Sequence, residues 1–175
     1  MQKTSHLTNC LMGWMRNVNA ITRTAMPIPE IFLDSSVLMA GIISSQGASR
    51  VLLLLSEDQK IRITISEQVI IEVERNIARK IPKILSYARE IILQSQIIIV
   101  RDPSKIDVLQ HQDWISHPAD VPILVAATIA KTEFLVTLNT KHFLDDPQVA
   151  LRAGLQIGTP GDALKWLRER FQEDI

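Results

Sequence analysis

Short apolar segments alternate along this chain with longer segments in which apolar residues recur at helical spacing. After position 29, five segments read as strands and six read as helices. The predicted strands are 30–34, 61–65, 97–101, 134–138 and 155–157, and the predicted helices are 37–43, 49–58, 66–80, 82–94, 120–131 and 160–171. Strands that alternate with helices predict a three-layer α/β/α sandwich around a mainly parallel sheet of about five strands.

Isoleucine reinforces this interpretation. The chain has 24 isoleucines, and many of them lie in the predicted strands. Nearly continuous β-branched apolar runs are typical of parallel strands that are covered on both faces. We therefore expect strands that are buried on both sides.

The first 29 residues differ from the rest of the chain. They contain three basic residues and no acidic one, and they show neither a steady helical period nor an apolar run of signal-peptide length. Two arginines and weak amphipathicity are poor support for an organelle transit peptide. We interpret residues 1–29 as a leader outside the fold, with Met26 as the expected natural start, and residues 30–175 as a single domain.

Composition limits the classes of function. The 19 basic and 19 acidic residues cancel, and 46% of the residues are hydrophobic, which excludes a disordered chain and a broadly basic surface. A single cysteine, Cys10, forms neither an intramolecular disulfide nor a cysteine metal cluster, which favours a reducing, cytoplasmic location. Because no apolar run approaches about 20 residues, we expect no membrane segment.

Three acidic residues stand at informative places in this pattern. Asp34 ends the first predicted strand, Asp120 opens a helix, and Glu72 lies inside the 66–80 helix. Ligands of open parallel sheets bind at the carboxyl ends of the strands. Each residue also has an ordinary explanation, since Asp34 and Asp120 are suited to cap helices and Glu72 to be a surface charge. Periodicity alone does not distinguish Glu72 from Glu74.

The order of these pieces resembles the PIN-domain family of metal-dependent ribonucleases, which includes VapC-like toxins. The matching pieces are Asp34 followed by Val37-Leu38, Ser66 with Glu72-Val73, the Asp120 helix, the segment 135–143 and Thr159-Pro160. The resemblance implies an endoribonuclease that hydrolyses RNA phosphodiester bonds with Mg²⁺ or Mn²⁺ held by Asp34, Glu72 and Asp120. Hard divalent cations prefer such oxygen ligands.

The chain departs from this family at two positions. Asn139 stands where many members carry a fourth catalytic acid, and Ser35-Ser36 stands where the family often has Thr-Asn. An amide carries no charge, so metal affinity should fall. The alternative is a PIN-like RNA- or protein-binding regulatory module with weakened catalysis. The nearby His117 and His142 receive no role, and each of five further acids is expected in a loop or a cap: Asp102, Asp107, Asp113, Asp145 and Asp146.

The resemblance also implies partners. Compact members of the family are often the toxin of a toxin–antitoxin pair, so we expect an RNA substrate, an antitoxin protein and a homodimer. Candidate phosphate contacts are Arg50, Arg79, Lys80, Lys83 and Lys141. The apolar segments 37–43 and 52–55 could form a dimer face, but we expect them in the core. A receiver module would need an earlier acidic pair, and a Rossmann nucleotide binder would need a glycine-rich loop after the first strand.

Overall fold

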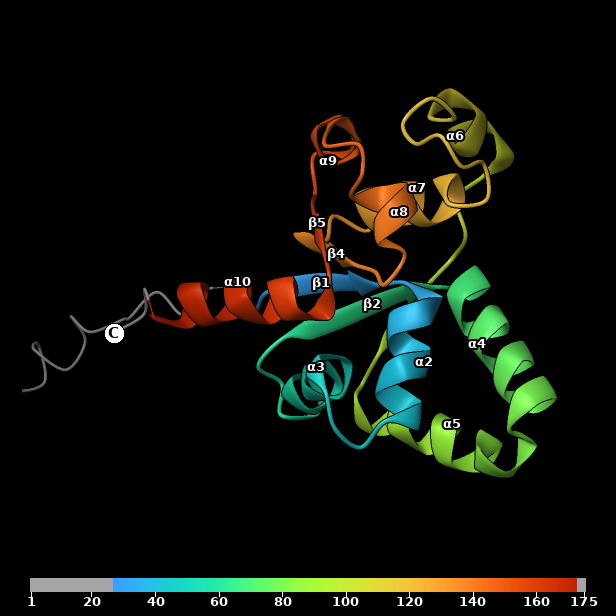
Figure 1. Ribbon diagram of the computed structural model, residues 1–175, viewed down its shortest axis with the longest axis vertical. Helices are drawn as coiled ribbons and strands as arrows, with labels where there is room; N and C mark the ends of the chain where they lie inside the picture. The colour runs from blue at the N-terminus through green and yellow to red at the C-terminus, as the bar shows by residue number, and fades with distance from the viewer. Residues whose placement is uncertain (1–26, 173–175) are drawn as a thin grey trace, which may run out of the picture.

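A five-stranded sheet lies at the centre of the computed structural model, which describes residues 27–172 (Figure 1). The strands are β1 (Glu30–Leu33), β2 (Arg62–Ser66), β3 (Ile98–Val100), β4 (Phe134–Val136) and β5 (Gln156–Gly158). Their order across the sheet is β3-β2-β1-β4-β5, and all four strand pairs are parallel. The predicted parallel sheet is therefore confirmed, while the predicted leader lies almost entirely outside the described residues.

Helices cover both faces of the sheet. They are α2 (Ser35–Ile43), α3 (Ala48–Glu57), α4 (Glu67–Lys80), the 3-10 turn η1 (Pro82–Ile84), α5 (Leu85–Gln94), α6 (Lys105–Gln110), α7 (Val121–Ile129), α8 (Thr140–Phe143), α9 (Gln148–Ala153) and α10 (Pro160–Gln172). Figure 1 shows α2, α3, α4 and α5 on one side of the sheet and α7 and α8 on the other. The predicted three-layer sandwich is confirmed.

The core consists mainly of the central strands and the helices packed on them. Ile31, Phe32 and Leu33 of β1 are fully buried. The segment 37–43 is also largely buried, although Ile43 at its end is 50% exposed. In α3, Leu52 is fully buried. The predicted use of these segments in the core is therefore confirmed except at Ile43 and at Leu54, which is 44% exposed, and the homodimer stays a prediction.

One part of the burial prediction is wrong. The strand β3 is not covered on both faces, because Ile98 is 41% and Ile99 is 48% exposed. This strand lies at the edge of the sheet and pairs only with β2. Continuous isoleucine was a sound indication of a strand but not of its place in the sheet.

Three short helices were not predicted: α6, α8 and α9, each of six residues or fewer. Periodicity needs a window of about 11 residues to indicate a helix, so segments of this length give no signal. Ser104 and Asp107 mark the start of α6 in the sequence as a capping pair. In the structure, Ser104 Oγ accepts from the Asp107 backbone amide and donates to the Asp107 carboxylate. These hydrogen bonds hold the pKa of Asp107 below its usual value. The cap expected for Asp107 is confirmed.

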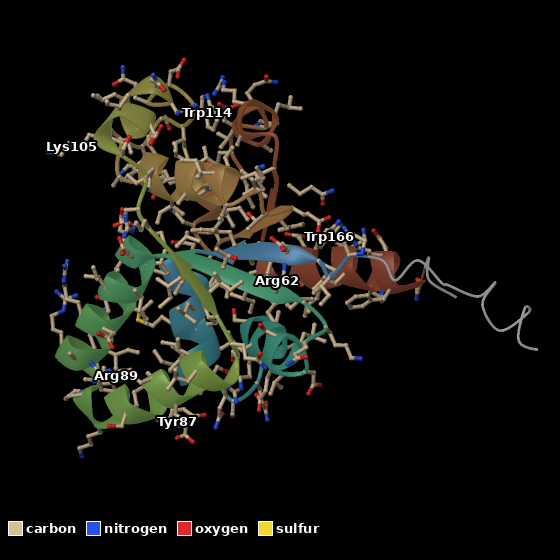
Figure 2. All side chains as sticks on the ribbon, turned by 180° about the vertical axis from the view of Figure 1, so that it is seen from behind. Arg62, Tyr87, Arg89, Lys105, Trp114 and Trp166 are labelled. Atoms are coloured by element: carbon tan, nitrogen blue, oxygen red, sulfur yellow. The ribbon has the colours of Figure 1, made fainter. Side chains whose placement is uncertain are left out.

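The orientation of α4 is supported by an ion pair with α5. Arg89 of α5 lies beside α4 in Figure 2, and its Nε donates to Glu74 Oε1 at 2.7 Å. The hydrogen bond and the charge of Glu74 raise the pKa of Arg89. Because Glu74 is engaged with α5, the ambiguity between Glu72 and Glu74 is reduced.

Among the described helices, no single one is long and apolar enough to cross a membrane. Only α2 and α3 taken together reach that length and apolarity, and an 88° bend separates them.

Candidate active site

Asp34 joins the ends of two neighbouring strands. It follows β1 directly, and its amide donates to Val136 O at the end of β4, at 3.0 Å. Its Oδ1 accepts from the Ser35 amide at 2.7 Å, and its Oδ2 accepts from Ser36 Oγ at 2.8 Å and from Thr137 Oγ1 at 2.9 Å. The capping interpretation of Asp34 is thus correct. A carboxylate offers about four lone-pair sites. Ser35 Oγ makes the fourth and longest contact, to Oδ1 at 3.4 Å, so a further ligand would have to replace this contact.

Ser36 also has a structural role at this junction. Its hydroxyl donates to Asp34 and accepts from the Leu138 amide at 3.2 Å. The serine that replaces the family's amide therefore ties the start of α2 to the segment after β4. This departure from the family pattern leaves the Asp34 carboxylate oriented.

Thr137 and Asn139 connect Asp34 to Asp120. The backbone N–H of Asn139 donates to Thr137 Oγ1 at 3.0 Å, and the Thr137 hydroxyl in turn donates to Asp34. The side-chain Nδ2 of Asn139 lies 3.5 Å from Asp120 Oδ2. The structure therefore brings three of the predicted site residues, Asp34, Asp120 and Asn139, to one region at the carboxyl ends of β1 and β4.

Asp120 does not cap the helix that it precedes. It occupies the N-cap position of α7, yet within residues 27–172 its carboxylate accepts no hydrogen bond from the amides of that helix. The carboxylate instead turns toward Asn139 and two histidines, and its side chain is only 17% exposed. For Asp120 the capping interpretation is wrong, and the orientation of the side chain indicates another use.

Two histidines share the Asp120 carboxylate. His142 Nδ1 lies 2.7 Å and His117 Nδ1 lies 3.2 Å from Asp120 Oδ2. The two imidazole rings stack with centroids 4.1 Å apart and an interplanar angle of 18°. In the part of the chain that the structure describes, these three residues are the one group of three His, Cys, Asp or Glu side chains whose ligand atoms all lie within 4.8 Å of one another.

Glu72 lies in a separate groove along α4. It is half-buried and lines a surface groove of about 480 Å³ with Arg75, Arg79 and Asp102. Asp102 accepts from the Gln68 amide at 2.8 Å at the start of this helix, so it acts as a cap. Glu72 is not in the compact group of possible ligands around Asp120, and the residues that line its groove include Arg75 and Arg79 instead.

The donor atoms decide which cation the site around Asp120 suits. They are one carboxylate oxygen and two imidazole nitrogens, with the Asn139 amide beside them. Mg²⁺ prefers oxygen ligands in octahedral geometry, while Mn²⁺ and later transition metals also accept imidazole. The residues present therefore fit a divalent cation, and they suit Mn²⁺ better than Mg²⁺.

Comparison with known proteins identifies the family. The model of the PIN domain matches residues 30–141, which is more than half of the chain. The chain belongs to the PIN-domain family. No curated protein matches it.

Several solved structures share the fold of this PIN domain. A toxin–antitoxin complex from Klebsiella pneumoniae is 22% identical, with a TM-score of 0.53, and the alignment covers 74% of this chain and 97% of that chain. VapBC2 from Rickettsia felis, bound to a DNA fragment from its promoter, is 20% identical, with a TM-score of 0.54 and coverage of 74% and 98%. A protein from Pyrobaculum aerophilum is 16% identical, with a TM-score of 0.55 and coverage of 83% and 98%.

Sequence reasoning missed two features of this PIN domain. His117 and His142 were given no role, although the Nδ1 atoms of both contact the Asp120 carboxylate. Arg75 was not among the candidate phosphate contacts, although it lines the groove of Glu72. The spacing of Glu72, Arg75 and Arg79 at three and four residues could have indicated this shared helix face.

Proposed function

We propose that this PIN domain is a divalent-metal-dependent endoribonuclease that hydrolyses RNA phosphodiester bonds. The observation that carries the proposal is the hydrogen-bonded connection from Asp34 through Thr137 and Asn139 to Asp120. It orients two carboxylates at the carboxyl ends of adjacent parallel strands, which is where ligands of this fold class bind.

Each residue has a defined part in the proposal. Asp120 and Asp34 would hold the cation, with Asn139 orienting Asp120. Glu72 stays a predicted ligand, although it lines the separate groove along α4. When bound, a divalent cation lowers the pKa of an attacking water and stabilises charge on the phosphate oxygens. Because Thr137, Ser36 and the Ser35 amide already orient Asp34, its carboxylate needs little rearrangement to bind a ligand.

The groove along α4 suits the RNA backbone. Arg75 and Arg79 lie on the same groove as Glu72, and guanidinium groups bind phosphate oxygens strongly. Of the basic residues predicted from the sequence to contact phosphate, Arg79 is the one in this groove. We therefore place the strand of RNA that leads into the site along α4.

The first expected result is cleavage of single-stranded RNA by the full chain that depends on a divalent metal. Products should appear with Mn²⁺ or Mg²⁺ and stop after EDTA, and excess Mn²⁺ should restore them. Electrophoresis of 5′-labelled RNA measures this directly. Cleavage that continues unchanged in EDTA would contradict the proposal, because the carboxylates would then have no cation to hold.

We further propose that an antitoxin protein controls this activity. One solved structure with this fold is described as a toxin–antitoxin complex and another as VapBC2 bound to promoter DNA, which supports a search for such a partner. A small protein encoded beside this chain should form a stable complex with it and stop RNA cleavage. A neighbouring protein that binds neither the chain nor its site would argue against this control.

Asn139 also supports a second candidate, a regulatory PIN domain with weakened catalysis. The Asn139→Asp variant should increase metal-dependent cleavage by about tenfold, because a carboxylate next to Asp120 attracts the cation more strongly than an amide does. Initial rates at subsaturating Mn²⁺ measure the effect.

The matched control is Gln112→Glu, which adds the same charge at an exposed position outside the site. This variant should cleave at the rate of the original chain. An unchanged or lower rate in Asn139→Asp would show that residue 139 is not the fourth position of the site.

A further inference from the structure

The hydrogen bonding around His142 is mismatched without a cation. Its Nδ1 lies 2.7 Å from Asp120 Oδ2 and 2.8 Å from Asn139 Nδ2. A protonated Nδ1 donates to the carboxylate but then faces the amide N–H of Asn139, and an unprotonated Nδ1 accepts from Asn139 but then faces the carboxylate lone pair. Turning the Asn139 amide over brings its oxygen toward Asp120 instead. As the side chains are placed, either protonation state of Nδ1 leaves one unfavourable contact, and the turned amide sets two oxygens about 3.5 Å apart.

A bound cation removes this mismatch. Once one of the two stacked rings turns, the cation would accept lone pairs from the Asp120 oxygen and from both imidazole nitrogens, so none of these atoms would need a proton. Metal–ligand bonds of this kind are about 2.0–2.2 Å long, which places neighbouring ligand atoms of a tetrahedral site about 3.3–3.6 Å apart. The 3.2 Å from Asp120 Oδ2 to His117 Nδ1 is close to that range, whereas the 2.7 Å to His142 Nδ1 is a hydrogen-bond distance that would lengthen when an ion binds.

The cluster is also open to ions from solution. The side chains of Asp120, His142 and His117 are 17%, 28% and 47% exposed. Among the described residues, the Asp120 carboxylate makes no hydrogen bond to the amides of α7 and faces the two histidines instead. The carboxylate is therefore the most buried of the three side chains, and the two imidazoles are more exposed.

We propose that His117, Asp120 and His142 form a binding site for a transition-metal dication of the Zn²⁺ class, with strong preference over Mg²⁺. Imidazole suits Zn²⁺, and affinity at mixed nitrogen and oxygen sites rises from Mn²⁺ toward Cu²⁺ and stays high for Zn²⁺. Three protein ligands leave further coordination positions open. The two histidines thus replace, with nitrogen ligands, the acid that is missing at Asn139. The role of this metal in RNA cleavage rests on the proposed function, but its binding does not.

The test is a calorimetric titration of ZnCl₂ and of MgCl₂ into the full chain that carries Cys10→Ser, which removes its one thiol. We expect one Zn²⁺ per chain, bound at least a hundredfold more tightly than Mg²⁺. His117→Ala and His142→Ala should each weaken Zn²⁺ binding at least tenfold. With Co²⁺ in place of Zn²⁺, the visible absorption of the ion should change when either histidine is removed.

His111→Ala is the matched control. This histidine lies in the same connecting segment, but its Nδ1 contacts Asp107 O at 2.6 Å and it takes no part in the cluster. Its removal should leave Zn²⁺ binding unchanged. Circular dichroism of each variant verifies that the fold is intact.

The outcomes separate this inference from the proposed function. Zn²⁺ affinity that is no higher than Mg²⁺ affinity, or that survives in the double variant His117→Ala, His142→Ala, overturns the metal site. If RNA is still cleaved with Mg²⁺ in that case, the proposed function stands without it. If the chain binds Zn²⁺ through the histidines but cleaves no RNA, the metal site is supported and the proposed nuclease function is overturned.

Discussion

Asp120→Asn should lower metal-dependent RNA cleavage by at least about a hundredfold while leaving the fold intact. The substitution keeps the shape of the side chain but removes the one negative charge in the cluster with His117 and His142. Loss of residues that merely orient a metal ligand costs about 10–100-fold, so loss of a charged ligand should cost at least the upper value. Initial rates with labelled RNA at fixed Mn²⁺ measure the effect.

The appropriate control is Asp113→Asn. Asp113 is an exposed acid in the segment that leads to Asp120, and its neutralisation changes the net charge of the chain by the same amount. It should leave the rate unchanged, and both variants should melt near the temperature of the original chain. If Asp120→Asn cleaves at the same rate as the control, the active site does not lie at the carboxyl ends of β1 and β4.

Phe32→Ala should lower the free energy of unfolding by about 3–5 kcal/mol, which is typical of a buried phenylalanine truncated to alanine. Phe32 is fully buried at the centre of β1, where it pairs with Thr64 of β2 and Leu135 of β4. Removal of the ring leaves a cavity between the sheet and its helices. Urea denaturation followed by circular dichroism measures the loss.

Tyr87→Ala provides the comparison for this variant. Tyr87 is also aromatic but lies on the outer surface of α5, 48% exposed (Figure 2). Its truncation should change the free energy of unfolding by less than about 1 kcal/mol, as is usual for surface substitutions. Equal losses in the two variants would mean that β1 is not the centre of the core.

The sheet could be predicted from the sequence because its strands carry a strong local signal. Segments such as 30–34 and 134–138 are short, apolar and bounded by turn residues, and this pattern does not depend on distant contacts. The order of the strands explains why the burial prediction failed at β3, since the edge positions of β3 and β5 are set by their neighbours. Local sequence contains no information about which strand has only one partner.

The candidate site was predictable only in part, for a related reason. Asp34 stands at the end of a strand and Asp120 at the start of a helix, so their positions in the sequence pattern were enough to select them as candidate site residues. Glu72 was selected by resemblance and stays a prediction, because the structure pairs Glu74 with Arg89 but places Glu72 in a groove outside the Asp120 cluster. The histidines gave no signal because 24 positions separate them and each lies in an irregular or very short element. Their meeting at Asp120 is a product of tertiary structure.

The different hydrogen bonding of the two aspartates has a consequence for homologous chains. Asp34 caps α2 and accepts hydrogen bonds from the segment after β4, so it contributes to stability even in a protein that cleaves nothing. A helix cap alone contributes about 0.5–2 kcal/mol. Asp120 has no such structural contact to the helix that follows it. Selection for folding alone would therefore retain Asp34 and release Asp120, so an inactive descendant would be recognised by the loss of the second aspartate.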